Sequence, residues 1–283
     1  MTVVVEFLGT GGAHSEDLGS SSARISLPNS QNMLIDFGPD TYFSVNTRKL
    51  QFDAIFITHA HLDHVGGLER LFFSVAFKKQ RLIKLYVPVS LVTRLHQIFG
   101  MAGSQVAEGG KNFWDCFQLI PITDYFYFSG YRFNVFPVRH HFPGEAFGLA
   151  LPGCFVYTGD TRPIPEQLVA HAGRGELIFH DATTSSNPAH SALDDLKREY
   201  ALHDVLDRLV LYHFDSAVER ELAETQGWKT VRLGVTYQFG CRHVCSGSMC
   251  SNAELSSLGT NKALHNERGT KLPRPSIKKD EFV

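Results

Sequence analysis

A short stretch of the chain, residues 58–67, contains a dense group of side chains that could bind metal ions. Within six residues, His59, His61, Asp63 and His64 supply three imidazoles and one carboxylate. These groups are good ligands for borderline divalent cations. The stretch follows an apolar segment and precedes a segment with helical periodicity. We therefore predict a metal site at a turn between a strand and a helix.

Candidate ligands also follow other apolar segments of the chain. One segment ends at His140 and His141. A second delivers Asp160 within Gly-Asp-Thr, and a third ends at His213. Strand ends can meet on one rim of a β-sandwich although they are far apart in sequence. Since neighbouring residues on a strand point to opposite faces, we expect only one of His140 and His141 to reach a metal.

The carboxylate of Asp36 has two interpretations. It ends the apolar run Met33-Leu34-Ile35 and precedes Phe37-Gly38. It could be an ordinary turn carboxylate. It could also accept a hydrogen bond from a metal-bound imidazole and so fix the tautomer of that ring. The residues alone leave both interpretations open.

The size and charge of the chain narrow the classes of protein to consider. With 283 residues, 43% of them hydrophobic, it can form one large domain or two small ones. The formal net charge of −2 gives no global attraction to nucleic acid or to an acidic membrane surface. The sequence has no apolar run of about 18 residues and no charged-then-apolar leader. We therefore expect a soluble, cytoplasmic protein with no membrane partner.

The order of apolar segments predicts an α/β protein. Short strands crowd the first two thirds of the chain, and helices lie between the later strands, which favours two sheets packed face to face with helices outside. We expect one helix over residues 62–77 and a closing strand over residues 229–235. Residues 1–240 would then form one domain. Residues 241–283 are polar, contain a Cys/His cluster, and are predicted to be a disordered tail.

These motifs resemble the metallo-β-lactamase superfamily over roughly residues 2–240. The resemblance rests on the run from His59 to His64, on Gly-Asp-Thr, and on a later histidine after an apolar strand. It implies a four-layer αββα sandwich with a two-metal site on one rim. On that pattern the first metal would take His59, His61 and His140. The second would take Asp63, His64 and His213, and Asp160 would bridge the two.

Within the superfamily, three further segments resemble the phosphodiesterase branch. They are residues 7–12, residues 34–38 and Phe136-Pro137-Val138-Arg139-His140. The last resembles the Phe-Pro-x-x-His strand end of that branch, which favours His140 as the ligand and leaves His141 to line a substrate pocket.

An additional histidine also resembles part of that branch. Ala189-His190-Ser191 is similar to a motif of the tRNA 3′-processing endonucleases and their small phosphodiesterase relatives. Without the family, His190 would be an ordinary surface residue beside the start of a helix. The resemblance implies that His190 acts as a general acid or stabilises an oxyanion, which suits an imidazole that titrates near neutrality.

The chain differs in two places from the enzymes of the phosphodiesterase branch that it resembles. The tRNA-processing enzymes carry a long tRNA-gripping insertion between the strand-end histidine and the bridging aspartate, but here His140 and Asp160 are only 20 residues apart. The small cyclic phosphodiesterase of phosphonate degradation carries a cysteine-rich insert that residues 13–30 lack. The resemblance is therefore to the branch and not to one enzyme.

We therefore predict hydrolysis of a small phosphodiester, cyclic or linear, by a hydroxide that two divalent metal ions share. Zn²⁺ is the expected metal, with Mn²⁺ or Fe as alternatives. Asp63 and His190 are the expected catalytic residues. A nuclease for RNA ends, a thioester or lactone hydrolase, and a non-catalytic accessory protein of cofactor biosynthesis are the alternatives. Nucleic acid is the less favoured substrate, and the sequence leaves a homodimer open.

Overall fold

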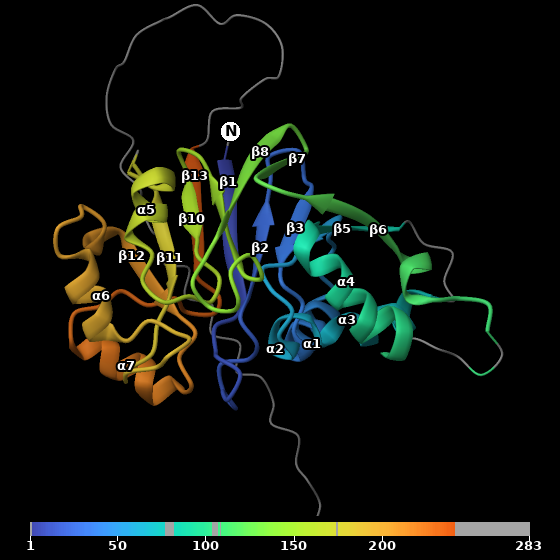
Figure 1. Cartoon of the computed structure of the whole chain (residues 1–283), viewed down its shortest axis with the longest axis horizontal. Helices are drawn as coiled ribbons and strands as arrows, with labels where there is room; N and C mark the ends of the chain where they lie inside the picture. Colours follow the sequence, from blue (N-terminus) through green and yellow to red (C-terminus); the bar gives the residue numbers. More distant parts are fainter. Residues whose placement is uncertain (1, 77–81, 104–106, 108, 174, 241–283) are drawn as a thin grey trace, which may run out of the picture.

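The computed structural model of the chain describes residues 2–76, 82–103, 107, 109–173 and 175–240. Within these ranges two β-sheets pack against each other, and helices cover both outer faces (Figure 1). This arrangement is the predicted four-layer αββα sandwich. The predicted tail, residues 241–283, lies outside the described residues, so the domain boundary at residue 240 stays a prediction.

The first sheet contains the strands that lead into the His-rich run. Its strand order is β13-β1-β2-β3-β4-β5-β6. Strands β3 to β6 are parallel to one another, and β1 runs in the same direction because it is antiparallel to β2, which is antiparallel to β3. The strands are β1 (Thr2–Gly9), β2 (Ser22–Ser26), β3 (Asn32–Ile35), β4 (Ala54–Phe56), β5 (Ile83–Pro88), β6 (Phe117–Ile122) and β13 (Thr236–Gly240).

The second sheet has the strand order β12-β11-β10-β9-β8-β7. Strands β10, β11 and β12 are parallel. Strand β8 runs in the same direction, because it is antiparallel to β9 and β9 is antiparallel to β10. The strands are β7 (Tyr125–Phe128), β8 (Tyr131–Pro137), β9 (Phe147–Leu151), β10 (Phe155–Tyr157), β11 (Leu177–Asp181) and β12 (Leu209–Tyr212).

The helices fall into two groups that cover different sheets (Figure 1). Buried residues such as Leu68, Phe72 and Leu95 pack on the first sheet, and Leu168 and Leu196 pack on the second. The helices are α1 (Pro39–Arg48), α2 (Leu62–Val65), α3 (Gly67–Val75), α4 (Val92–Leu95), α5 (Pro165–His171), α6 (Leu193–Tyr200) and α7 (Ala217–Thr225). Shorter helical turns cover Val89–Leu91, Phe113–Cys116 and Leu206–Arg208, and a π-helix covers His96–Gly103.

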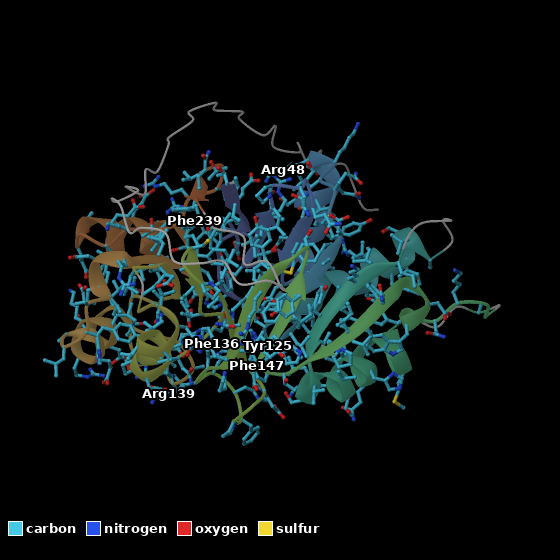
Figure 2. All side chains as sticks on the ribbon, turned by 90° about the horizontal axis from the view of Figure 1, so that it is seen from above. Arg48, Tyr125, Phe136, Arg139, Phe147 and Phe239 are labelled. Carbon is cyan, nitrogen blue, oxygen red and sulfur yellow. The ribbon has the colours of Figure 1, made fainter. Side chains whose placement is uncertain are left out.

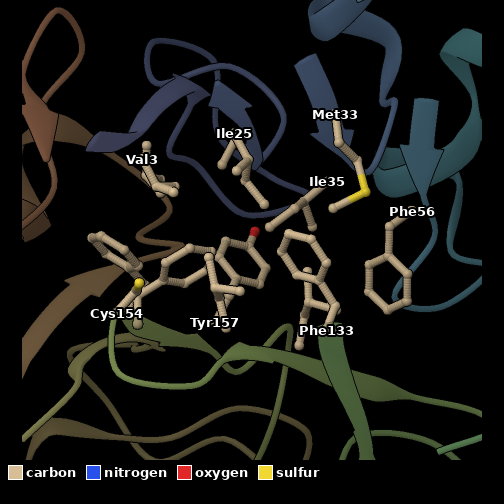
Figure 3. Close-up of a cluster of buried hydrophobic side chains, with 14 of the residues drawn as sticks. Val3, Ile25, Met33, Ile35, Phe56, Phe133, Cys154 and Tyr157 are labelled. Carbon is tan, nitrogen blue, oxygen red and sulfur yellow. The ribbon is translucent and has the colours of Figure 1, made fainter. Parts of the chain in front are cut away.

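An aromatic-rich core holds the two sheets together. The ring of Phe7 in β1 lies 5.9, 5.2 and 5.5 Å, between centroids, from Tyr157, Phe179 and Tyr212 of the second sheet. Figure 3 shows the same layer, with side chains such as Met33 on the first sheet facing the second. Burial of these apolar surfaces is the main favourable term in folding. Because both sheets pack on one core, their rims are fixed relative to each other.

Figure 2 labels three residues on or just beyond strands β8 and β9 of the second sheet. Phe136 is in β8 and Phe147 is in β9, and Arg139 lies beyond the end of β8. Pro137 pairs with Phe147 across the two strands. The backbone of β8 is therefore fixed by β9 up to two residues before Arg139.

Two element predictions were wrong. The expected helix over 62–77 is divided into α2 and α3, because the N–H of Gly67 donates at 2.9 Å to the carbonyl oxygen of Phe37, which lies outside the helix. The expected closing strand over 229–235 is replaced by β13, which pairs with β1. Helix α1 was not predicted, since it buries only Thr41 and has little apolar periodicity. Among the described residues, no helix is long and apolar enough to cross a membrane.

Candidate metal centre

One rim of the sandwich collects the carboxyl ends of strands from both sheets. Strands β1, β3 and β4 of the first sheet end there, as do β8, β10, β11 and β12 of the second. Polar side chains follow these ends at Asp36, at residues 59–64, and at His140, Asp160, Asp181 and His213. The topology therefore brings together residues that are up to 177 positions apart, counted from Asp36 to His213.

The carboxylate of Asp160 lies at the middle of this group. Its Oδ2 atom lies 3.1 Å from the Nε2 atoms of both His64 and His213. The Nε2 atoms of His59 and His140 lie 3.7 Å from the same oxygen. Asp160 is buried, and two of these histidines come from each sheet. One carboxylate thus faces four imidazoles.

The structure brings together all seven residues that the sequence suggested as ligands. Their ligand atoms form two neighbouring groups, each within 4.8 Å, made of His59, His61 and His140, and of Asp63, His64, Asp160 and His213. The Nδ1 atom of His61 lies 3.1 Å from the Nε2 atoms of His59 and His140. Either group has a composition that could hold a divalent metal ion.

Several buried atoms in these groups fit a metal. His64 Nε2, both ring nitrogens of His213 and Asp160 Oδ1 are buried and have no hydrogen-bond partner among the described residues. Such atoms are costly to bury unless something binds them. Burial and the nearby His140 lower the pKa of His61 to about 4, and burial lowers the pKa of His59 well below its ordinary value. These two imidazoles are therefore neutral, which is the form that binds a metal, whereas the Asp160 carboxylate raises the pKa of His213 to about 9 despite its burial.

The charge of Asp160 suits the same role. Burial alone would raise the pKa of its carboxyl, but the neighbouring His213 and His64 hold that pKa well below its usual range. The side chain is therefore an ionised carboxylate in a buried position. A buried carboxylate of this kind requires positive charge beside it.

Asp36 contacts the ring nitrogen of His64 that faces away from Asp160. Its Oδ2 atom lies 2.7 Å from His64 Nδ1 and accepts a hydrogen bond of 2.7 Å from the Thr58 hydroxyl. Its Oδ1 atom accepts the Thr58 N–H at 2.8 Å. Asp36 has a φ of 59°, a left-handed conformation that is unfavourable for a residue with a side chain. These contacts fix His64 with Nε2 toward the centre, which matches the second interpretation of Asp36.

The two adjacent histidines take different directions. His140 Nδ1 donates to the carbonyl oxygen of Ala189 at 2.9 Å, so its Nε2 atom faces Asp160. His141 instead lies 2.6 Å from Glu145, between Nδ1 and Oε2, and 3.5 Å from Arg94. The ring of His141 is still 5.4 Å from that of His61. It therefore lies at the border of the centre.

Asp181 was missed by the sequence analysis. It is fully buried at the end of β11, and its Oδ2 atom lies 2.9 Å from His190 Nδ1. The same oxygen accepts the Thr161 N–H at 2.8 Å, and Oδ1 lies 3.5 Å from His213 Nδ1. Its sequence signal was the one that marked Asp36, a carboxylate directly after an apolar strand.

His190 lies beside both groups of ligands. Its ring is 4.6 Å from that of His213 and 4.8 Å from that of His140. Burial would lower its pKa, but the Asp181 carboxylate raises that pKa above the ordinary value. His190 is therefore part of the rim, as the resemblance implied, and not a free surface residue.

The backbone of His213 is held by the glycine-rich loop after β1. His213 has a φ of 79°, and its N–H donates to the carbonyl oxygen of Thr10 at 2.8 Å. Gly12 lies so close that a Cβ there would be 3.1 Å from the imidazole of His213. The loop therefore serves close backbone approach, and strain of this kind is common at functional sites.

A cavity of about 610 Å³ adjoins the centre. His140 is the one predicted ligand that lines it, and His141, Glu166, Gln167 and Pro188 are also in its lining. Its size is in the range of pockets for small molecules.

Comparison with known proteins identifies the family. The family model of Anti-Pycsar protein Apyc1 matches residues 3–237. The chain belongs to the Apyc1 family. An Anti-Pycsar protein Apyc1 from Paenibacillus sp. (strain J14) is 36% identical over 230 residues, which cover 77% of this chain and 92% of the relative. An Apyc1 protein from Bacillus phage BSP38 is 28% identical over 260 residues, which cover 83% and 98%.

Solved structures similar to this Apyc1-family chain confirm the metallo-β-lactamase fold. A diphosphatase of the PhnP family has a TM-score of 0.69 and 20% identity, over 84% of this chain and 98% of that one. The metallo-β-lactamase fold protein YhfI from Bacillus subtilis has a TM-score of 0.64 and 12% identity, over 84% and 100%. The short form of human tRNase Z has a TM-score of 0.55 and 22% identity, over 81% and 96%. The fold that the resemblance implied is thus confirmed.

Proposed function

We propose that this chain is a metal-dependent hydrolase that opens a small cyclic phosphodiester. The main support is the position of Asp160, whose Oδ2 atom faces four imidazoles at distances of 3.1 to 3.7 Å. Two ligand groups that share one carboxylate suit a pair of metal ions. The anti-Pycsar name of the family fits degradation of a cyclic nucleotide, so this is the substrate class that we propose.

In this proposal the two ligand groups hold two divalent ions. His59, His61 and His140 would hold one ion, Asp63, His64 and His213 would hold the other, and the Asp160 carboxylate lies within 3.7 Å of histidines from both groups. Zn²⁺ suits this mixture of imidazole and carboxylate, and Mn²⁺ or Fe are the alternatives. When bound, such ions supply Lewis acidity to the phosphoryl oxygens and lower the pKa of a water molecule.

The side chains of the protein provide the proton transfers. Asp181 holds His190 Nδ1 at 2.9 Å, which leaves Nε2 of that ring to give a proton to the leaving oxygen. Asp63 is more exposed than the other members of its ligand group, with 18% of its side chain accessible, and the neighbouring His64 lowers the pKa of its carboxyl although burial would raise it. Asp63 therefore remains ionised and can accept the proton of an attacking water.

The shape of the chain near the centre favours a small substrate. The interval between His140 and Asp160 holds only a loop and the tight β9–β10 hairpin, with Pro152 and Gly153 at its turn. An arm that grips a folded RNA has no place in this interval. The adjoining cavity of about 610 Å³ is large enough for a nucleotide.

A substrate panel tests the proposal. Metal-loaded protein would be assayed on 3′,5′-cyclic nucleotides, bis(p-nitrophenyl) phosphate, an RNA with a 3′ extension, a thioester and a lactone. We expect the fastest turnover on a cyclic nucleotide and none with His64→Ala. Faster cleavage of the RNA would replace the proposal with a nuclease, and exclusive turnover of the thioester or lactone would remove phosphodiester chemistry altogether.

A further inference from the structure

We infer that Arg162 is a positioning residue that holds the loop 187–190, and with it His190, against the metal centre. The inference rests on the proposed function, because it concerns how the proton donor of that reaction is placed. Arg162 follows Asp160 by two residues, so it leaves the same strand end as the central carboxylate. Sequence analysis gave it no role.

The guanidinium of Arg162 contacts the loop through its main chain. Its Nη1 atom donates to the carbonyl oxygen of Asn187 at 2.8 Å and to that of His190 at 2.9 Å. The same nitrogen lies 2.5 Å from Asp195 Oδ2. Hydrogen bonds from a charged donor are about twice as strong as those between neutral groups. A single side chain therefore binds both ends of this short loop.

The loop 187–190 contains one histidine of the centre and contacts a second. The side-chain oxygen of Asn187 accepts the N–H groups of Ala189 and His190, at 2.8 and 3.2 Å. The carbonyl oxygen of Ala189 accepts the Nδ1–H of His140 at 2.9 Å. The loop that Arg162 holds thus carries His190 and also accepts a hydrogen bond from His140.

His190 is consequently held from two directions. Asp181 contacts its imidazole, and Arg162 contacts its main-chain carbonyl. Asp181 is itself bound to the N–H of Thr161, the residue between Asp160 and Arg162. Without Arg162, the main-chain carbonyls of Asn187 and His190 would lose their charged donor, and the loop would keep the contacts of Ala189 with His140 and of Ser191 with Thr161 beside that of Asp181 with His190. Two fixed points place the ring within the small tolerance that proton transfer requires.

The carboxylate of Asp195 balances the positive charge of Arg162 beside the loop. Asp195, at the start of α6, is buried and also lies 2.5 Å from Arg198. These two arginines lower the pKa of the Asp195 carboxyl, although burial would raise it. The pair of Arg162 and Asp195 therefore joins the loop to α6 in one ionised network.

Variants at Arg162 and His190 test this inference. Arg162→Met removes the donor, Arg162→Lys keeps a shorter cation, and His190→Ala removes the proton donor. The matched control is Arg208→Met, since Arg208 also donates to main-chain carbonyls, those of Ala172 and Glu176 at 2.6 and 2.9 Å, but away from the centre. The measurements are kcat, KM, metal content and amide hydrogen exchange of the 185–191 peptide.

We expect Arg162→Met to lower kcat by about 10- to 100-fold, with KM and metal content near the wild-type values. Amide exchange of the loop should become faster, and Arg162→Lys should restore part of both effects. The double variant Arg162→Met/His190→Ala should be no slower than His190→Ala, because Arg162 acts through His190. Arg208→Met should change neither kcat nor loop exchange.

Other outcomes overturn the inference. Additive losses in the double variant, unchanged loop exchange in Arg162→Met, or an equal loss in Arg208→Met would each exclude positioning through His190. If Arg162→Met does not fold, the same measurements are made on Arg162→Lys. Amide exchange of the 185–191 peptide must then be faster in Arg162→Lys than in the wild type for the inference to stand. If the wild-type protein turns over no phosphodiester, the proposed function fails, whereas the exchange measurements still decide whether Arg162 holds the loop.

Discussion

At the scale of residues, the centre depends on a few carboxylates that act on imidazoles from different sides. Asp160 faces four of them, Asp36 contacts the Nδ1 atom of His64, which is one of the four, and Asp181 contacts the Nδ1 atom of His190. Carboxylates that orient metal-binding histidines fix the tautomer and raise the basicity of the ring. Asp36 and Asp181 occupy equivalent places, one after β3 in the first sheet and one at the end of β11 in the second.

Replacement of Asp181 tests this pairing. Asp181→Asn should lower turnover by about 10- to 100-fold, because the amide cannot balance a protonated His190 and removes one of the two carboxylate charges beside His213. Metal content should fall less than turnover. Steady-state kinetics with metal analysis measure both quantities. Asp194→Asn, at a side chain that is 93% exposed, is the control and should behave as the wild type. Wild-type turnover in Asp181→Asn would contradict the role given to this residue.

Many of the central residues could be predicted from the sequence, and the reason is local. The run from His59 to His64 is dense enough to indicate a metal site without other information. Asp181 could not be chosen in this way, since a single carboxylate after a strand is common and its partner His190 is nine residues away. The role of Arg162 could not be predicted from the sequence either, because its acceptors are main-chain carbonyls, which every residue has.

At the scale of elements, the centre is an assembly of strand ends that close backbone contacts keep in place. The turn after β3 packs directly on the turn that carries Asp63. A Cβ at Gly38 would lie 1.9 Å from the carbonyl oxygen of Asp63, so only glycine fits there. A main-chain hydrogen bond from Gly67 to Phe37 divides α2 from α3, and apolar periodicity alone could not predict this contact with a distant turn.

Gly38→Ala should therefore displace the ligand turn. We expect a loss of about 1–3 kcal/mol of unfolding free energy together with reduced metal content. Thermal unfolding and metal analysis would measure the two effects. Gly240→Ala is the matched control, because no atom of the described chain lies within 4 Å of a Cβ there. An unchanged unfolding temperature in Gly38→Ala would show that the two turns are not tightly packed.

At the scale of the whole molecule, two sheets share one apolar core and present their carboxyl ends at a common rim. The sequence predicted this architecture because strands and helices alternate with clear apolar patterns. It misplaced the closing strand, since β13 is recognised only through its pairing with β1 at the other end of the chain. The rim therefore depends on contacts that are distant in sequence, and the metal ions proposed for it would join the two sheets.

Removal of metal should for this reason destabilise the whole sandwich. Metal ions that bind only the folded chain stabilise it by about 2.7 kcal/mol when their concentration is 100 times the dissociation constant. For a chain of this size that corresponds to a decrease in the unfolding temperature of roughly 5–10 °C after chelation. Added Zn²⁺ should restore the original value. Equal unfolding temperatures with and without chelator would count against a metal centre that spans both sheets.

The most direct test of the proposed function is the hydrolysis of a 3′,5′-cyclic nucleotide by metal-loaded wild-type protein and by Asp160→Ala. Asp160 is the carboxylate that faces imidazoles from both sheets. We predict metal-dependent turnover by the wild type and by the exposed-site control Asp194→Ala. In Asp160→Ala we predict turnover at least about 1000-fold lower with a folded circular dichroism spectrum. Metal-dependent turnover in Asp160→Ala at the wild-type rate would contradict the proposed function.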